Sequence, residues 1–194
     1  MINTGLVGAM LATNPSYSTI PLSIQFLTIA LTLIPVSLLM GKFGRRSMFL
    51  LGSLAAFIGC LIIAFSIIDK SFYLFILGSI FLGFSQANQQ FYRYAAADNV
   101  SNNLKSKAIS LVLAGGVIAA VVGPEVSRYS FDLFPDYIYL ATYLIAAFIQ
   151  ILNFTILIFV KIKKPEATAK NLRPLSFILM QRTLIIAILA AAVG

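Results

Sequence analysis

Three glutamines and one arginine lie within eight residues that follow an apolar run. They are Gln86, Gln89, Gln90 and Arg93, in the segment QANQQFYR. In a helix, their offsets of 0, 3, 4 and 7 residues place them on one face. Amides donate and accept hydrogen bonds, and a guanidinium holds an anionic group or pairs with a carboxylate such as Asp98. The pattern therefore predicts non-covalent recognition of a polar solute, with Arg93 as the anchor for negative charge.

Covalent chemistry lacks its usual residues. The sequence has no His and a single Cys, Cys60, in the middle of an apolar run, which excludes a zinc site, a Cys-His pair and an internal disulfide. No nucleophile and base are grouped, and no phosphate-binding glycine loop is present. We therefore expect neither enzymatic activity nor a metal or cofactor, and we interpret Cys60 as a small core residue.

The composition places the polar segment in a membrane protein. Hydrophobic residues make up 60% of the chain and charged residues 10%, whereas soluble domains carry about 25% charged residues. A net charge of +8 suggests nucleic acid in a soluble protein, but in a membrane protein it marks loops held in the cytoplasm. The expected partner is the lipid bilayer and not nucleic acid. The polar face then has a second interpretation, a helix leaving the membrane with Arg93 extended to the interface.

Uncharged runs predict how the chain divides into helices. Runs of 22, 22, 17 and 24 residues separate charged residues between Arg46 and Lys161, and a transmembrane helix needs about 20 residues. Another run follows the helix-breaking Asn14-Pro15. Barrel strands alternate in polarity and do not give such runs. The sequence thus predicts an all-α, polytopic transmembrane bundle with five complete spans, near 20–40, 47–68, 71–92, 108–125 and 137–160.

Each end of the chain carries a shorter apolar run. Residues 1–12 and 183–194 are runs of 12, which at 1.5 Å per residue cross about 18 Å of a hydrocarbon core of about 30 Å. We interpret them as a partial first span and the start of a seventh span. The chain is then expected to be a piece of a larger protein, with residues 161–182 as a basic cytoplasmic loop.

The cations are distributed unevenly between the loops. Twelve of the 14 Lys and Arg residues lie in three segments, 41–46, 93–107 and 161–182. The loops between them hold only Lys70 and Arg128. Because membrane proteins keep Lys and Arg on the cytoplasmic side, the three segments should face the cytoplasm.

The loop between the second and third spans has a recognisable pattern. Gly44, Arg45 and Arg46 follow Lys42, and two spans joined by a tight loop ending Gly-Arg-Arg resemble the N-terminal half of a major facilitator superfamily transporter. That family typically reads G-x-L-A-D-R-x-G-R-R/K here, and Gly41 stands where the Asp is expected. The resemblance implies that these five residues form a cytoplasmic gating loop. The cations could also bind the carbonyls of a helix C-terminus, or merely set the topology.

The predicted fifth span is rich in small residues. Gly115, Gly116 and Gly123 belong to a stripe of the kind that lets another helix approach closely. Pro124 should then bend or end the helix. Gly123-Pro124 also resembles the fifth-helix motif of proton-coupled antiporters in the same superfamily.

Other polar residues within or beside the spans are isolated. Gln25 and Asn153 should bond across helices, because unpaired polar groups are costly in lipid. Glu125 and Asp98 are candidates for proton or ion coupling. For Glu125, which follows Pro124, a solvated helix end is the alternative.

The family resemblance implies a function as well as a fold. Residues 1–160 would form the N-terminal half of a secondary transporter in a cell membrane, in bacteria the inner membrane. It would move a small organic solute by alternating access against a C-terminal half of the same protein, and Gly123-Pro124 favours efflux. The alternative is a small structural or assembly subunit of a membrane complex, with the small-residue stripes as docking faces.

Overall fold

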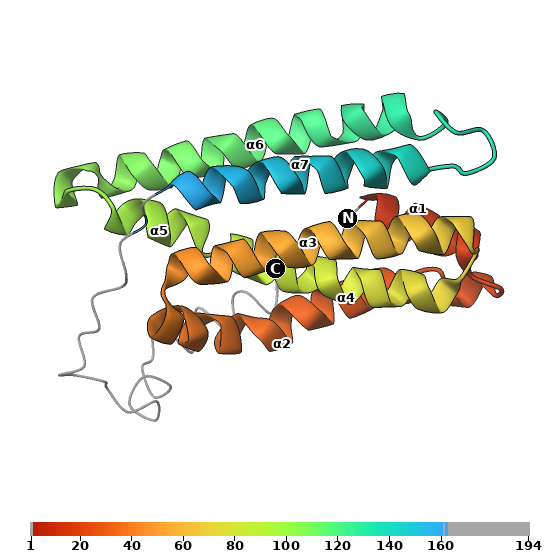
Figure 1. Ribbon diagram of the computed structural model, residues 1–194, viewed down its shortest axis with the longest axis horizontal. Coiled ribbons are helices and arrows are strands. Elements are labelled where there is room, and N and C mark those ends of the chain that lie inside the picture. Colours follow the sequence, from red (N-terminus) through yellow and green to blue (C-terminus); the bar gives the residue numbers. More distant parts are fainter. Residues whose placement is uncertain (1, 161, 163–194) are drawn as a thin grey trace, which may run out of the picture.

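The computed structural model describes residues 2–160 and 162 (Figure 1). Within these residues the regular structure is helical. In chain order the elements are α1 (Ile2–Leu11), η1 (Pro15–Tyr17), α2 (Ile20–Phe43), α3 (Arg45–Ile68), α4 (Phe72–Gln89), α5 (Tyr92–Asp98), η2 (Asn102–Leu104), α6 (Lys105–Ser130) and α7 (Leu140–Phe159). The predicted all-α bundle is confirmed. The predicted seventh span, 183–194, and most of the predicted loop 161–182 lie outside the described residues.

Four helical segments of this part of the chain are long and apolar enough to cross a membrane. They are Pro15–Phe43, Arg45–Ile68, Asn102–Ser130 and Leu140–Phe159. α4 is not among the four, because four of its last five residues, SQANQ, are polar and lower its mean hydropathy.

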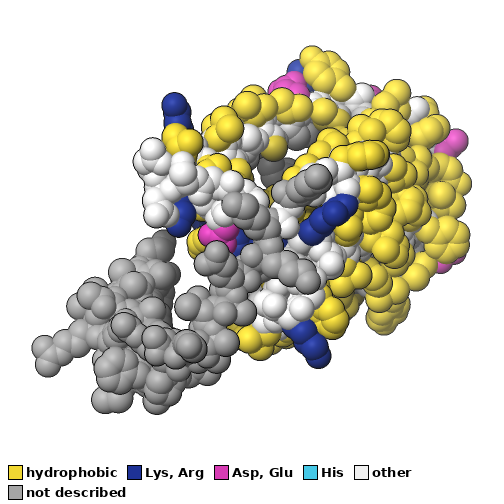
Figure 2. Space-filling model, turned by 60° about the vertical axis from the view of Figure 1, so that its left-hand side comes forward, with side chains coloured by type: hydrophobic (Ala, Val, Ile, Leu, Met, Phe, Trp, Pro, Cys, Tyr) yellow, Lys and Arg dark blue, Asp and Glu magenta, His cyan; other side chains and the backbone are white. Residues whose placement is uncertain are grey.

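The helices lie side by side, and their connections alternate between the two ends of the bundle (Figure 1). The α2–α3 turn and the α5–α6 connection lie at one end, and the α3–α4 and α6–α7 connections lie at the other. In Figure 2 Lys and Arg side chains project near the first of these ends, while hydrophobic side chains cover the flank behind it. We call this first end the basic end.

α3 forms the centre of the bundle. It packs mainly against α4 and α7, and 56% of its membrane-crossing window is buried, against 0% for that of α6. The backbones of α3 and α4 approach closely, since a Cβ on Gly59 would lie 3.1 Å from the carbonyl oxygen of Gly78. On the other side of α4, a Cβ on Gly83 would lie 2.7 Å from the carbonyl oxygen of Gln25 in α2. These glycines hold α2, α4 and α3 together as a packed layer.

A single residue connects α2 and α3. Gly44 has φ 87° and ψ 152°, a combination that is essentially confined to glycine. Its N–H donates to the carbonyl of Met40 at 3.0 Å, which closes the last turn of α2. The turn therefore reverses the chain at once and places Arg45 and Arg46 in the first turn of α3.

α6 contains Pro124 in its interior. The sequence predicted that Pro124 bends or ends the helix. The helix continues past Pro124 to Ser130, so it does not end there, and the bend stays a prediction. Membrane helices tolerate proline because the freed backbone group can be satisfied locally. A Cβ added at Gly115, Gly116 or Gly123 meets no described atom within 4 Å. Close packing on that stripe therefore stays a prediction for segments beyond the described residues.

Candidate functional site

The polar stripe, the set of Gln86, Gln89, Gln90 and Arg93, does not lie on one unbroken helix. α4 ends at Gln89 and α5 begins at Tyr92, and the N–H of Phe91 donates to the carbonyl of Asn88 three residues back, at 3.1 Å. This tightened turn divides Gln86 and Gln89 from Arg93. Beside this turn the Tyr92 ring sits edge-on to Phe49, with ring centroids 4.6 Å apart. The prediction of one continuous helical face is wrong at this turn.

Two members of the stripe carry buried polar atoms. Gln86 is half-buried, and its Oε1 has no hydrogen-bond partner among the described residues. Arg93 is also half-buried; its Nε has no such partner within the same set, and its guanidinium lies 5.0 Å from the centroid of the Tyr94 ring. Gln89 and Gln90 are exposed. A buried acceptor or donor without a hydrogen bond costs free energy. Gln86 Oε1 and Arg93 Nε therefore favour the binding of a polar ligand.

The predicted gating loop between α2 and α3 contacts two other helices. Arg45 forms an ion pair with Asp98 at the end of α5, with Nη1 and Oδ2 2.6 Å apart. Arg46 donates from Nη2 to the backbone carbonyl of Ile158 in the last turn of α7, the kind of helix C-terminus at which a cation is favoured. Lys42 is exposed and lies over the Phe43 ring, 5.5 Å from its centroid. The loop thus joins the ends of α3, α5 and α7 at the basic end.

Asp98 has a different partner from the one considered in the sequence. The proposed pairing with Arg93 is replaced by the ion pair with Arg45. α5 ends at Asp98, which brings the carboxylate to the start of α3, far away in sequence. The sequence offered no local signal for this partner, because Arg45 and Asp98 lie on different helices.

A further polar set joins α3 to α7. Ser53 donates from Oγ to the backbone carbonyl of Gln150 at 3.0 Å, and Asn153 donates from Nδ2 to Ser53 Oγ at 3.4 Å. The expected interhelical bond of Asn153 is present. Gln25, at 1% exposure, has neither amide atom bonded among the described residues, so its predicted bond across helices is not made there. Ser53 was missed because a lone Ser in an apolar run gives no signal.

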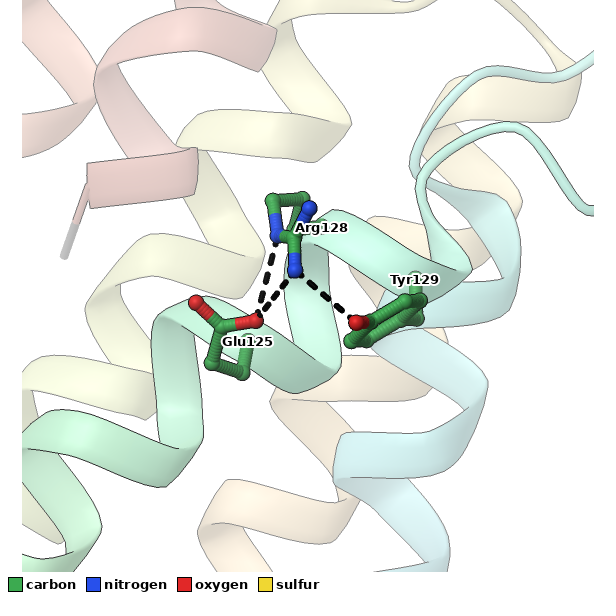
Figure 3. A network of polar contacts seen from close by, with 3 residues as sticks. All are labelled: Glu125, Arg128 and Tyr129. Carbon is green, nitrogen blue, oxygen red and sulfur yellow. Dashed lines mark hydrogen bonds and ion pairs between the residues drawn. The ribbon is translucent and has the colours of Figure 1, made fainter.

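Glu125 lies within α6 and belongs to a small surface network at the end opposite the basic end (Figure 3). Its Oε2 accepts from Arg128 Nη2 at 2.7 Å and from Nε at 3.1 Å. Arg128 Nη2 also donates to the Tyr129 hydroxyl at 2.9 Å. The Glu125 side chain is exposed, which agrees with the solvated position considered as the alternative. It lies within the helix, however, and not at a helix end.

Two cavities of the described residues lie away from the polar stripe. One, of about 330 Å³, is lined by α1, the end of α3 and the α6–α7 connection, and includes Lys70 and Asp136. The other, of about 380 Å³, lies between α6 and α7. Neither is lined by Gln86, Gln89, Gln90 or Arg93. The transport path that these residues were predicted to line stays a prediction.

In a comparison with known protein families, the model of the Major Facilitator Superfamily matches residues 1–194. Among curated proteins, the riboflavin transporter RfnT of Brucella anthropi is 35% identical over 190 residues, covering 96% of this chain and 48% of its own length. The chain thus spans about half of this relative. No solved structure matches the chain.

Proposed function

Because this chain belongs to the major facilitator superfamily, we propose that it forms the N-terminal half of a secondary transporter for a small organic solute. The family and the transporter relative favour this over an enzyme and over an assembly subunit of a membrane complex. The chain is a multi-pass membrane protein, and we propose the inner membrane of a bacterium as its location. Transport would proceed by alternating access against a second half.

One observation carries the proposed solute site. Gln86 Oε1 and Arg93 Nε are a buried acceptor and a buried donor without partners in the described part of the chain, one in the last turn of α4 and the other in α5. In the superfamily such groups would face the space between the two halves. A solute with both acceptor and donor groups would satisfy them, and an anionic group would bind Arg93 most strongly.

Riboflavin is the first solute to test, because the relative RfnT is a riboflavin transporter. We propose efflux, on the resemblance of Gly123-Pro124 to the antiporter motif. The ties of Arg45 to Asp98 and of Arg46 to the end of α7 would hold the basic end together in one state of the cycle and open in the other. Glu125 and Asp98 remain proposed candidates for coupling a proton or ion.

Cysteine accessibility tests the proposed site. In a Cys60→Ser background, Gln86→Cys, Gln90→Cys and Arg93→Cys would be treated with a membrane-impermeant thiol reagent from the cytoplasmic side. We expect reaction at these positions, protection by riboflavin, and no reaction at Ala87→Cys, since Ala87 is fully buried. Positions 86 and 90 staying inert while Phe84→Cys and Asn88→Cys react would show that the stripe faces protein or lipid.

Transport by the full-length protein separates binding from folding. Arg93→Ala should lower riboflavin flux at least about tenfold, the effect of losing one charge-assisted hydrogen bond, with membrane insertion unchanged. Gln86→Ala should raise the apparent KM more than it lowers expression. Asn103→Ala serves as the matched control, because Asn103 is an exposed amide outside this set. Equal effects at Gln86 and Asn103 would contradict the assignment of the site.

A further inference from the structure

An apolar groove runs between α6 and α7 toward the end opposite the basic end. Its volume is about 380 Å³, within the range of small-ligand sites. The apolar residues that line it are Val121, Val122, Val126, Leu133 and Ile145. Three of them, Val121, Val122 and Leu133, are at least half exposed. Among the described residues no further helix lines this groove, so within a membrane this part of the chain leaves it open to acyl chains.

Charged and polar groups stand at the edge of this groove. Glu125 and Tyr129 line it directly, and Arg128 bonds to both of them (Figure 3). The side chains of Arg128 and Glu125 are 62% and 53% exposed. Arg128 is two residues before the end of α6 at Ser130. The network therefore lies near the level where a membrane helix meets the headgroups.

We propose that this groove and its edge bind a phospholipid with a phosphoethanolamine headgroup. One acyl chain lies along the valines and Leu133. The ammonium of the headgroup donates to Glu125, and its phosphate accepts from Arg128 and from the Tyr129 hydroxyl. A bound headgroup replaces part of the Glu125–Arg128 pair with two charge-assisted contacts of the same kind.

The charges decide between possible occupants. A lipid headgroup with a net negative charge would be attracted by Arg128 and repelled by Glu125, so its net electrostatic gain on binding is small. A quaternary choline cannot donate a hydrogen bond to Glu125. A protein helix laid over the groove would bury the ion pair, whose desolvation opposes binding. A primary ammonium next to a phosphate matches the opposite charges one by one.

Tryptophan fluorescence tests the proposal, because the chain has no Trp. Leu133→Trp places a single fluorophore at the groove, and Phe65→Trp places one on α3, where Phe65 is 59% exposed. Each chain would be reconstituted in mixtures of phosphatidylcholine with brominated phosphatidylethanolamine, brominated phosphatidylglycerol or brominated phosphatidylcholine. Quenching by each brominated lipid gives its relative binding at that position. Quenching at position 65 also reports insertion.

We expect phosphatidylethanolamine to bind about threefold better than phosphatidylcholine at position 133 and equally well at position 65, since exposed ion pairs are weak. Glu125→Gln and Arg128→Gln should each bring the ratio at position 133 to about one. A ratio of one without these substitutions, a ratio that survives both, or a preference for phosphatidylglycerol would overturn the proposal.

Cross-linking in intact membranes gives a second measurement that needs no purification. Phosphatidylethanolamine with a photoactivatable acyl chain should label residues 121–133, and Arg128→Gln should lower that labelling while labelling of residues 58–68 stays constant. Equal labelling of 121–133 by the phosphatidylcholine analogue would count against the proposed headgroup. Labelling that Arg128→Gln leaves unchanged would count against the proposed contacts.

Discussion

Gly44 is the residue at which the α2–α3 turn depends on a missing side chain. Its φ of 87° with ψ of 152° costs a non-glycine residue about 1–3 kcal/mol. We therefore expect Gly44→Ala to destabilise the chain by that amount. Gly41→Ala is the matched control, because a Cβ at Gly41 meets nothing within 4 Å and Ala favours a helix. Thermal unfolding in detergent checks both, and equal midpoints would refute the role of the turn.

The Arg45–Asp98 pair should be the strongest side-chain tie at the basic end. The Arg45 side chain is 15% exposed and that of Asp98 45%, so solvent screens the pair partly. Asp98→Asn should destabilise the chain by about 1 kcal/mol. Asp132→Asn makes the same change at an exposed carboxylate of the opposite connection and should have almost no effect.

A charge reversal distinguishes the ion pair from a general effect of Asp98. The double change Arg45→Asp with Asp98→Arg should recover part of the stability lost in either single reversal. Thermal unfolding of the four chains gives the coupling. Additive losses in the double variant would mean that the two side chains do not interact in solution.

At this scale the sequence predicted residue types better than their contacts. Gln86 and Arg93 stand out because polar side chains in an apolar run are costly. The break between them lies beside the packing of Tyr92 against Phe49, a contact between two helices. The same holds for Asp98, whose partner is 53 positions away in the chain. Spacing along one helix carries no information about either contact.

Between helices, glycines define how closely α3 and α4 approach. A Cβ at Gly59 would lie 2.9 Å from Phe81 Cβ and 3.1 Å from the Gly78 carbonyl oxygen. Gly59→Ala should therefore cost about 1–3 kcal/mol through overpacking. Gly116→Ala, at a position with open space around it, should be neutral or slightly stabilising. Unfolding midpoints of the two variants in the 194-residue chain test this, and a larger loss at Gly116 would show that α6 is covered.

The sequence could predict the helices but not which of them are central. Uncharged runs predicted spans near α2, α3, α4, α6 and α7, because the membrane sets the length of an apolar helix. Among the described residues the close contacts lie at Gly59, Gly78 and Gly83, which the sequence did not single out, and packing on the stripe of Gly115, Gly116 and Gly123 stays a prediction. A small residue permits close packing wherever it stands, and only the tertiary arrangement decides which stripe is used.

The whole molecule is organised by its two ends. Alternating connections place the α2–α3 turn and the α5–α6 connection together (Figure 1), and these segments carry the clusters of Lys and Arg. The folded chain thus gathers at one end charges that are spread along the sequence. This gathering was predictable, because an even number of crossings returns the chain to the same side. The contacts that the charges make at that end were not.

The orientation of the bundle is the prediction for the whole molecule. Twelve of the 14 cations lie in the segments 41–46, 93–107 and 161–182, and cations near membrane helices are retained in the cytoplasm. Reporters fused after Met40 and within 161–175 should therefore be cytoplasmic, and reporters fused near Asp69 and Asp132 should be exterior. Alkaline phosphatase, active only outside the cytoplasm, and green fluorescent protein, fluorescent inside it, give opposite readouts at each site. An active phosphatase after Met40 together with a fluorescent fusion near Asp69 would show that the bundle has the opposite orientation in the membrane. The proposed solute site at Gln86 and Arg93 would then open to the exterior, and the lipid groove at Glu125 would face the inner leaflet.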